Sequence, residues 1–514
     1  MDSCAILRAR TLVCVLFVCA GMTVGRAQVA VTTWHYDNAR SGANPNETIL
    51  TPQNVNYKEF GKLFTQPVDG AVIGQALYLP GVTIPGVGVH NVVYAVTMND
   101  SVYAFDADSA TGANSSPLWH TSFLINGATA VPIDLQGCGA TTQWTEVGVL
   151  STPVIDPVAG TLYVVAKTYE NSAFVHRLHA LDVTTGMEKT GSPVVITASY
   201  EFDGKNNVFA DAMQVNRPAL LLENGNLYIA FGSNGCRGDY EEGWVVAYDA
   251  STLQPEGAFD DEPSDSAAAV WMRGGGLSSD SAGNIYGATA DGDFMAGTNF
   301  GQSVFKLSQV GSTLQLADWF TPFNERKLDH DDLDMSEPVL VLPNQAGKYP
   351  HLMAAVGKEG TIYILNRDNM GHFCSTCTQT DTQIVEELTA FAPETGALVY
   401  WNNAVYTTGA GIKIAALALK KGVLAQTPFV QSQTTSQGHS PVLSANGTTA
   451  GILWTTGQNL TAYNALTLVK LYSSAQAPNG RDALPPLPHF ANLAVANGKV
   501  YVGTNDSLVV YGLL

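Results

Sequence analysis

The sequence predicts an all-β fold, an eight-bladed β-propeller whose blades are four-stranded antiparallel sheets, with seven blades as the alternative. Three observations lead to this prediction. One strand–turn–strand motif occurs eight times along the 514 residues, with roughly 46 to 76 residues between copies. Only 14% of the residues are charged and Gly occurs 49 times, a composition that favours strands and tight turns. Amphipathic segments of helical length are nearly absent after the first 27 residues.

The repeated motif is clearest in the stretch NVVYAVTMNDSVYAFD, which begins at Asn91. Two runs of alternating apolar residues meet at Asn99-Asp100, which we expect to form a two-residue hairpin turn. Several copies follow another strand signal about ten residues earlier, and a fourth strand comes after, such as residues 116–124. Each unit therefore predicts one blade. The sixth copy, residues 403–422, is the most degenerate, and its completeness stays open.

The two ends of the chain are expected to close the ring. The last unit stops at Leu514, directly after its third strand. Residues 60–70, FGKLFTQPVDG, look like an isolated fourth strand that would complete this last blade and leave no open edge. The prediction is one propeller domain over residues 60–514, preceded by an N-terminal extension over residues 28–59.

Residues 1–27 read as a signal peptide. Arg8 and Arg10 precede a short apolar run, and the small residues Gly25 and Ala27 suit cleavage after Ala27. No cysteine lies where a lipoprotein signal requires one, and the apolar run is too short to span a membrane. We therefore expect a secreted or periplasmic monomer without a membrane span. The net charge of −20 argues against nucleic acid as a partner.

The repeat, G-x-[LV]-Y-V, a turn, then [LV]-[YH]-A-[LF]-D-x-x-T-G, resembles the pyrroloquinoline-quinone (PQQ) type propeller repeat. That repeat occurs in quinoprotein alcohol dehydrogenases and in the outer-membrane barrel-assembly lipoprotein. The similarity covers residues 60–514, and the stretches WHYDNARSGANPNET and GKEGTIYILNRDNMGHF look most like uncharacterised exported bacterial members. The resemblance is specific for architecture. It says little about chemistry, because the family mixes enzymes with non-catalytic scaffolds.

The resemblance implies PQQ and Ca²⁺ as the cofactors to look for. Quinoprotein alcohol dehydrogenases hold PQQ between a tryptophan and a disulfide of two adjacent cysteines, beside Ca²⁺ and a catalytic aspartate. This sequence has no Cys-Cys pair, which speaks against that subtype. Four tryptophans offer stacking surfaces, although core packing explains them as well: Trp144, Trp244, Trp271 and Trp401.

Two acidic stretches are candidate metal sites, because calcium needs several converging oxygen ligands. The richer one, LDHDDLDMSE, supplies Asp329, Asp331, Asp332 and Asp334. It matches no calcium-loop motif, so a solvated acidic loop is the alternative. The second is TADGDFMAG, where Asp291 and Asp293 flank a glycine. A tight turn without a metal explains these residues equally well. Lys358, in a hairpin turn, is expected to be solvated.

A third set of candidates follows from the architecture. The innermost strand of each blade lines the central channel, so polar residues at the starts of these strands are expected to converge at one mouth. They would bind a polar ligand, or one carboxylate would act as a base, unless they satisfy one another and ordered water. The set is Glu146, Asn216, Arg217, Arg273, Asp334, Glu337, His439 and His489.

The mature chain keeps four cysteines, which an oxidising compartment favours as disulfides. Cys374 and Cys377 form a CxxC pair, for which a small disulfide loop is the first interpretation and a redox pair or half a zinc site the alternatives. The other candidates are Cys138 and Cys236.

Two functions remain. The first is a ligand- or protein-binding or scaffold module with a small-molecule or envelope-protein partner that the sequence does not identify. The second is a PQQ- and Ca²⁺-dependent dehydrogenase of an alcohol or sugar, in which Glu146 or Asp334 helps to hold Ca²⁺ or serves as base. Serine-hydrolase, zinc-protease, Walker and Rossmann motifs are absent, and no catalytic residue is assigned.

Overall fold

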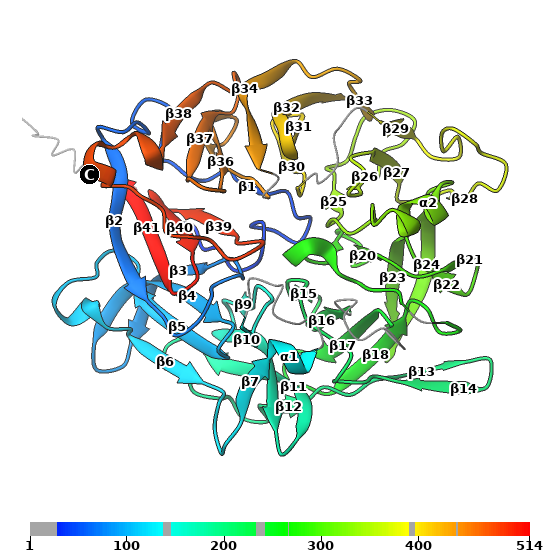
Figure 1. The fold of residues 1–514 in the computed structure, drawn as a ribbon, viewed down its shortest axis with the longest axis horizontal. Helices are drawn as coiled ribbons and strands as arrows, with labels where there is room; N and C mark the ends of the chain where they lie inside the picture. Colours follow the sequence, from blue (N-terminus) through cyan, green and yellow to red (C-terminus); the bar gives the residue numbers. More distant parts are fainter. Residues whose placement is uncertain (1–27, 137–144, 233–241, 266, 390–395, 438–439) are drawn as a thin grey trace, which may run out of the picture.

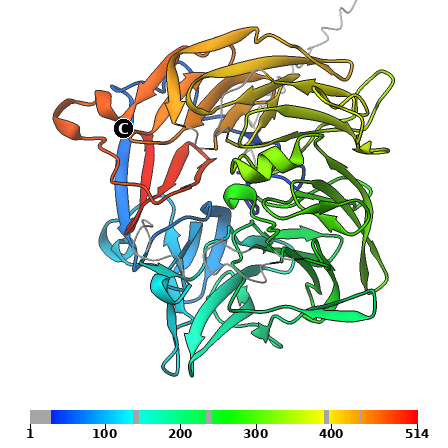
Figure 2. The ribbon, with the colours of Figure 1, turned by 45° about the vertical axis from the view of Figure 1, so that its right-hand side comes forward.

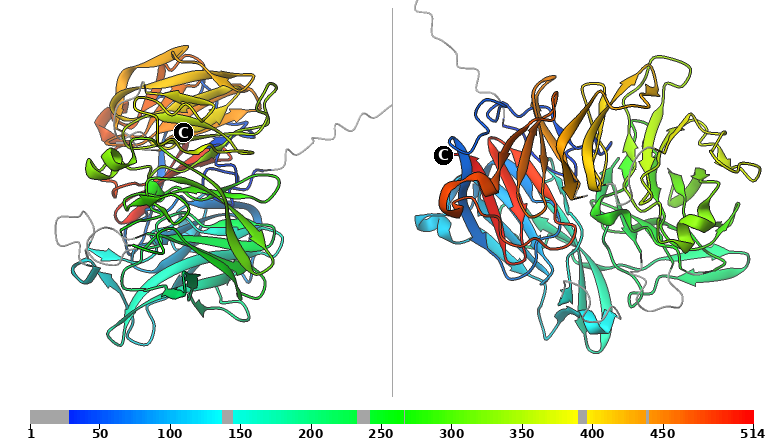
Figure 3. Two further views of the ribbon diagram at one scale, coloured as in Figure 1. Left: turned by 90° about the vertical axis from the view of Figure 1, so that its right-hand side faces the viewer. Right: turned by 45° about the horizontal axis from the view of Figure 1, so that its top comes forward.

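The computed structural model describes residues 28–136, 145–232, 242–265, 267–389, 396–437 and 440–514. Eight β-sheets stand around a central axis like the blades of a propeller, in chain order (Figure 1). This confirms the eight-bladed all-β prediction. The tilted views show the same ring from its edge and from above (Figures 2 and 3). The predicted signal peptide lies outside the described residues.

Each of the first four blades is a meander whose innermost strand comes first. Blade 1 consists of β3 (Leu77–Ile84), β4 (Gly88–Thr97), β5 (Ser101–Asp106) and β6 (Trp119–Ser122). Blade 2 consists of β9 (Val154–Asp156), β10 (Thr161–Glu170), β11 (Ala173–Asp182) and β12 (Val194–Val195). Blade 3 consists of β15 (Leu221–Glu223), β16 (Asn226–Phe231), β17 (Trp244–Asp249) and β18 (Pro255–Asp260). Blade 4 consists of β19 (Ser278–Ser279), β20 (Ile285–Ala288), β23 (Val304–Val310) and β24 (Thr313–Thr321).

The other blades follow the same plan. Blade 5 consists of β25 (Leu340–Val341), β26 (Leu352–Val356), β27 (Ile362–Asn366) and β29 (Glu386–Leu388). Blade 6 consists of β30 (Val399–Trp401), β31 (Ala404–Thr407), β32 (Ala410–Lys420) and β34 (Val430–Gln437), with β33 (Val423–Leu424) beside β32. Blade 7 consists of β35 (Val442–Asn446), β36 (Thr449–Thr455), β37 (Thr461–Asn464) and β38 (Lys470–Ser473). Blade 8 consists of β39 (Leu493–Ala496), β40 (Lys499–Gly503), β41 (Ser507–Leu513) and β2 (Phe60–Pro67).

Short elements decorate the loops between these strands. Two are helices, α1 (Ile133–Gln136) and α2 (Glu325–His330), and none of the helices in the described part of the chain has the length and apolar character to cross a membrane. The remaining strands are β1 (Ala43–Asn44), β7 (Thr129–Pro132), β8 (Glu146–Val147), β13 (Ser199–Phe202), β14 (Lys205–Val208), β21 (Phe294–Met295), β22 (Asn299–Phe300) and β28 (His372–Phe373).

The core lies between neighbouring blades. Tyr163 and Leu178 of blade 2, for example, pack against Ile229 and Trp244 of blade 3 in one buried apolar cluster. Because a middle strand faces a neighbouring sheet on both sides, its side chains are buried on both faces, as all six residues of β5 are. This explains why the strands read as apolar runs and not as a strict apolar–polar alternation.

The ends of the chain close the ring as expected. β2 pairs antiparallel with β41, from Phe60 opposite Leu513 to Pro67 opposite Ser507. Blade 8 therefore combines one strand from near the N-terminus with three from the C-terminus, and the C-terminus lies beside β2 (Figure 1). The closure covers the edge of β41 that the C-terminal strands alone would leave unpaired.

Two local expectations have outcomes in the structure. The first hairpin pairs Thr97 with Ser101, so its loop has three residues and not the expected two; Asp100 takes the left-handed conformation (φ 50°) that such a loop requires. Blade 6 is complete, because β34 supplies the outer strand alongside β32, through an irregular register. That irregularity accounts for the degenerate sixth copy of the motif.

Residues 31–44 form what we call the channel floor. This segment runs around the inside of the ring and hydrogen-bonds to the innermost strand of every blade, in blade order. The bonded pairs are Val31 with Tyr78, Thr32 with Ile155, Asn38 with Leu222 and Ser279, Ala39 with Val341, Ser41 with Tyr400, Gly42 with Leu443, and Asn44 with Val495.

Three large side chains of the floor fill the centre of the ring. Trp34, His35 and Arg40 are fully buried, and the rings of Trp34 and His35 stack 3.5 Å apart. The Arg40 guanidinium donates to the carbonyl oxygens of Leu277 (2.7 Å) and Leu220 (3.2 Å), which lead into blades 4 and 3. The channel mouth therefore ends on a floor made from residues 31–44.

Candidate functional site

A stack of cations and aromatic rings occupies the channel mouth. The Arg217 guanidinium carbon lies 3.9 Å from the Phe490 ring centre and 4.7 Å from that of Trp271. Arg273 lies over Phe490 at 5.2 Å, and its Nη1 donates to Glu337 Oε1 at 2.8 Å. Each residue stands just before an innermost strand, which is why the blade repeat brings them together.

The arginine stack rests on the channel floor. Trp34 Nε1 donates to the amide oxygen of Asn492 (3.0 Å). Asn492 in turn donates to the carbonyl oxygens of Ile73 (3.1 Å) and Phe490 (3.2 Å). Phe490 takes a left-handed backbone conformation (φ 65°), an unfavourable state for an aromatic residue that its ring contacts and this hydrogen bond help to hold.

Two guanidinium groups lie beside one carboxylate in this stack. Burial lowers the pKa of Arg217 to about 9, and the neighbouring Arg273 adds to the shift while Glu337 opposes it. Arg217 therefore remains protonated at neutral pH. Its charge is held by aromatic faces and by the Glu337 carboxylate, which also pairs with Arg273.

A second group at the mouth, the carboxylate trio, consists of Asp291, Asp332 and Asp334. One oxygen from each lies within 4.8 Å of the others. Asp291 comes from the loop after β20, whereas the other two precede β25, so the two acidic stretches of the sequence meet here. Hard oxygen donors at this spacing suit a divalent cation such as Ca²⁺.

Lys358 lies against the trio. Its ammonium group donates to Asp334 Oδ2 at 2.6 Å and also to Asp332, and Gln302 Nε2 donates to Asp334 Oδ1 at 2.8 Å. The Lys358 side chain is 17% exposed, so it is paired and not simply solvated as expected. Burial, and next the Asp334 charge, raise the pKa of Asp291 to about 7, although Lys358 opposes the shift.

The other predicted metal ligands stand apart from the trio. Asp331 is exposed and pairs with two residues of α2, Lys327 (2.5 Å) and His330 (2.8 Å), the last residue of that helix. Asp329 is not part of the trio; burial, and next the charge of Asp334, raise its pKa. Of the two predicted acidic stretches, LDHDDLDMSE thus contributes two residues to the trio and TADGDFMAG contributes one.

The remaining mouth candidates divide into those near the stack and those away from it. His489 stacks on Phe490 with ring centres 3.6 Å apart and belongs to the mouth. Asn216 donates to the Ala230 carbonyl oxygen (2.8 Å), a backbone contact. Glu146 lies on β8 near Asp69, and burial followed by that charge raises its pKa. His439 lies outside the described residues.

The described cysteine pair, Cys374 and Cys377, lies away from the mouth. Cys374 and Cys377 form a disulfide with Cα atoms 5.4 Å apart, in the loop after β28 at the rim of the ring. Cys138 and Cys236 lie outside the described residues.

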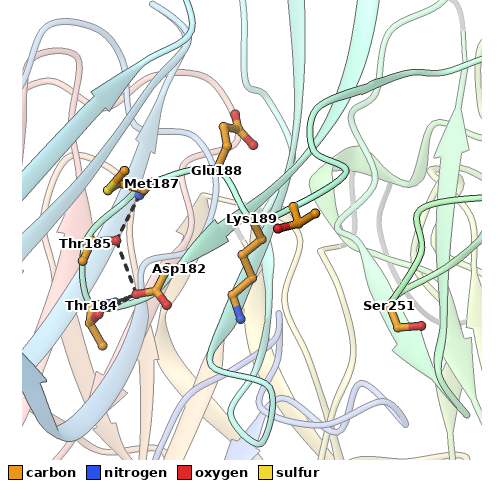
Figure 4. A pocket seen from close by; sticks show the side chains of 8 residues that line it. Asp182, Thr184, Thr185, Met187, Glu188, Lys189 and Ser251 are labelled. Carbon is orange, nitrogen blue, oxygen red and sulfur yellow. Dashed lines mark hydrogen bonds between the residues drawn. The ribbon is translucent and has the colours of Figure 1, made fainter.

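A further cavity of about 520 Å³ lies at the rim, between the turn after β11 and blade 3 (Figure 4). Its polar groups serve the turn itself. Asp182 accepts hydrogen bonds from the Thr184 amide (2.8 Å) and hydroxyl (2.5 Å) and from the Thr185 hydroxyl (3.4 Å). This is the D-x-x-T-G end of the repeated motif, so we assign it a structural role.

Sequence reasoning identified both arginines and Glu337 but missed Phe490, Trp34 and Lys358. Phe490 directly follows the predicted His489, and the HF pair before an innermost strand was the available signal. Trp34 and Lys358 carry no such signal, because their positions depend on the path of the floor and on packing between blades.

No family model and no curated protein matches the chain. Solved structures do. The quinohemoprotein alcohol dehydrogenase of Comamonas testosteroni is 15% identical, with a TM-score of 0.60, over 94% of this chain and 80% of that one. The quinohemoprotein alcohol dehydrogenase ADHIIG of Pseudomonas putida HK5 is 13% identical, with a TM-score of 0.61, over 94% of this chain and 80% of that one. A europium-containing methanol dehydrogenase is 12% identical, with a TM-score of 0.57, over 94% of this chain and 98% of that one. The chain therefore shares its eight-bladed propeller fold with these three proteins.

Proposed function

We propose that this protein is an exported propeller that binds a small organic anion at the channel mouth, without an oxidoreductase activity of its own. The observation that carries the proposal is the stacked guanidinium of Arg217, held between Phe490 and Trp271 with a second arginine beside it. The channel floor below limits the ligand to approach from the mouth.

The charge distribution favours an anion. The whole chain carries a net charge of −20 and the carboxylate trio lies at the same mouth, but within the arginine stack itself two guanidinium groups meet one carboxylate. Arginine forks match planar carboxylates in two parallel hydrogen bonds. The rings of Trp271 and Phe490 add flat apolar surface, which suits a ligand with a planar or apolar body.

The export part of the proposal rests on the signal-like residues 1–27. Expression of the full gene product in a Gram-negative host, followed by cell fractionation and N-terminal sequencing, tests it. We expect a periplasmic or secreted chain that begins at Gln28. Recovery of an uncleaved chain in the cytoplasm contradicts export and leaves the ligand proposal to its own test.

The carboxylate trio favours a second candidate, a PQQ- and Ca²⁺-dependent dehydrogenase. The oxygen donors fit Ca²⁺ in number and chemistry, although Lys358 already bonds two of the three carboxylates. The residues do not match the quinone site that the resemblance implies, because the sequence has no Cys-Cys pair and the Arg217 guanidinium already lies against the rings of Trp271 and Phe490. We therefore rank this candidate second and assign it no reaction step.

The test is calorimetric titration of the mature full-length chain with three probes: citrate, benzene-1,3,5-tricarboxylate and PQQ, the last with and without Ca²⁺. We expect one of the two simple carboxylates to bind and Arg273→Met to weaken it by roughly tenfold, the loss of one charge-assisted pair. Arg326→Met is the matched control, since Arg326 is 93% exposed on α2. No binding by either simple carboxylate, or equal binding by both variants, contradicts the proposal.

The same titration separates the two functions. Stoichiometric binding of PQQ that requires Ca²⁺, together with reduction of an artificial electron acceptor by an alcohol or a sugar, would establish the dehydrogenase and refute the binding protein. A flat titration with PQQ and Ca²⁺ removes the dehydrogenase.

A further inference from the structure

Two adjoining cavities lie beside the hairpin between β36 and β37 in blade 7. The first, of about 230 Å³, lies between this hairpin and β34 of blade 6. The second, of about 440 Å³, lies between the tip of the same hairpin and the segment LPPLPH, residues 484–489. Gly457 and Gln458 line both, so the two form one surface, which we call the blade 7 groove.

The chemistry of the groove differs from that of the arginine stack and the carboxylate trio. The first cavity is lined mostly by threonine and serine, with the amides of Gln458 and Asn459. Among the described residues, neither cavity has an aspartate or glutamate in its lining, although the chain as a whole carries a net charge of −20. Lys470 is the one described lining residue whose side chain has a fixed charge.

One buried hydroxyl points to a ligand of matching chemistry. Thr456 lines the first cavity and is only 4% exposed, and its hydroxyl oxygen has no hydrogen-bond partner among the described residues. A buried hydroxyl that lacks a partner is costly unless a water or a ligand supplies one. Nearby hydroxyls are already oriented, as Thr434 Oγ1 lies 3.4 Å from the Tyr463 hydroxyl.

The second cavity supplies an apolar wall. Leu484, Leu487 and three prolines line it, and proline has no backbone N–H to satisfy. The wall ends at His489, whose ring stacks on Phe490 at the channel mouth. The blade 7 groove therefore joins a hydroxyl- and amide-rich part to a rigid apolar part that ends at the mouth.

We propose that the blade 7 groove binds an uncharged oligosaccharide. Sugar hydroxyls match the threonine, serine and amide groups of the first cavity, and the C–H faces of sugar rings match the proline wall of the second. The lack of carboxylates and the single lysine disfavour recognition by charge. A peptide is the competing occupant and is an outcome of the test. The proposal does not depend on the anion bound by the arginine stack.

The experiment titrates the mature full-length chain by calorimetry with four neutral hexasaccharides: maltohexaose, cellohexaose, xylohexaose and chitohexaose. We expect at least one to bind, and both Thr456→Val and Gln458→Ala to weaken it by roughly tenfold, the loss of one hydrogen bond. Gln458 is exposed, so its variant tests the groove without disturbing buried packing. Thr313→Val, on the exposed outer strand β24, is the matched control and should bind like the wild type.

Three results would overturn the proposal. They are no binding of any of the four sugars, binding that neither groove variant weakens, and binding of an unrelated uncharged hexapeptide with a comparable affinity that the same variants weaken. Repeating the titration with Arg273→Met separates this site from the arginine stack, because sugar binding should be unchanged.

Discussion

Arg40 in the channel floor and Arg217 at the mouth are both buried arginines, but their surroundings differ. Arg40 donates to three backbone carbonyl oxygens and to the Thr33 hydroxyl, at 2.7 to 3.2 Å. Arg217 lies between two aromatic rings, next to another arginine. A guanidinium whose donors meet fixed backbone oxygens holds the fold together. Arg217, in contrast, is stacked among side chains, close to a like charge and to the Glu337 carboxylate.

The largest effect is expected in the floor. Arg40→Met leaves the carbonyl oxygens of Leu277 and Leu220 buried without their donor, so the free energy of unfolding should fall by about 3 to 5 kcal/mol. Urea unfolding followed by tryptophan fluorescence measures it. Arg326→Met, on the surface, should change the value by less than about 0.5 kcal/mol. Equal stabilities of the two variants would show that the floor contributes little to stability.

The next effect concerns Asp291 at the mouth and depends on pH. The folded state holds its proton up to a pKa of about 7, mainly because of burial, so ionisation costs stability as the pH rises from about 4 through 7. Asp291→Asn removes this cost. The variant should match the wild type near pH 4 and exceed it by about 4 kcal/mol at pH 8. Asp134→Asn, exposed in α1, is the control; a difference that does not vary with pH would refute the assignment.

A smaller effect is expected for cation binding at the trio. Lys358→Met removes the ammonium that bonds Asp332 and Asp334, so Ca²⁺ affinity at pH 8 should rise by roughly tenfold, about 1.4 kcal/mol. Affinity should also increase as the pH passes 7, where Asp291 loses its proton. Calorimetric Ca²⁺ titration measures both, with Lys348→Met as control. Unchanged affinity would show that the trio does not bind the ion.

The smallest effect is expected at the rim. Cys374→Ser opens the disulfide to Cys377, which closes a loop of only a few residues and so restricts the unfolded chain little. The free energy of unfolding should fall by about 1 kcal/mol, and ligand binding at the mouth should not change. A loss as large as that of Arg40→Met would mean that the rim loop supports the core.

Much of the fold was predictable because its causes are local. Alternating strands, turn residues and the unpaired β2 segment each leave a pattern within about ten residues. The position of Arg217 and Arg273 followed from the same repeat, since both precede innermost strands. The error at Asp100, a three-residue loop in place of two, concerns the register: Thr97, and not Met98, lies opposite Ser101.

The rest was not predictable because it depends on contacts between distant segments. The sequence of the channel floor has no periodicity. From the sequence alone Arg40 looks like an exposed arginine, because its burial depends on the eight blades around it. The carboxylate trio combines Asp291 with Asp334 across neighbouring blades, and Lys358 comes from a third hairpin. One sequence shows which residues each loop contains, but it does not show which loops come into contact in the fold.

The path of the channel floor has a consequence for the order in which the molecule is made. Residues 31–44 leave the ribosome before any blade exists, yet Asn44 bonds to Val495, and β2 pairs with β41 at the very end of the chain. The contacts of this segment with blade 8 therefore form only after the C-terminal strands exist. A chain that stops before residue 493 lacks three strands of blade 8, and its first segment has no complete ring in which to settle.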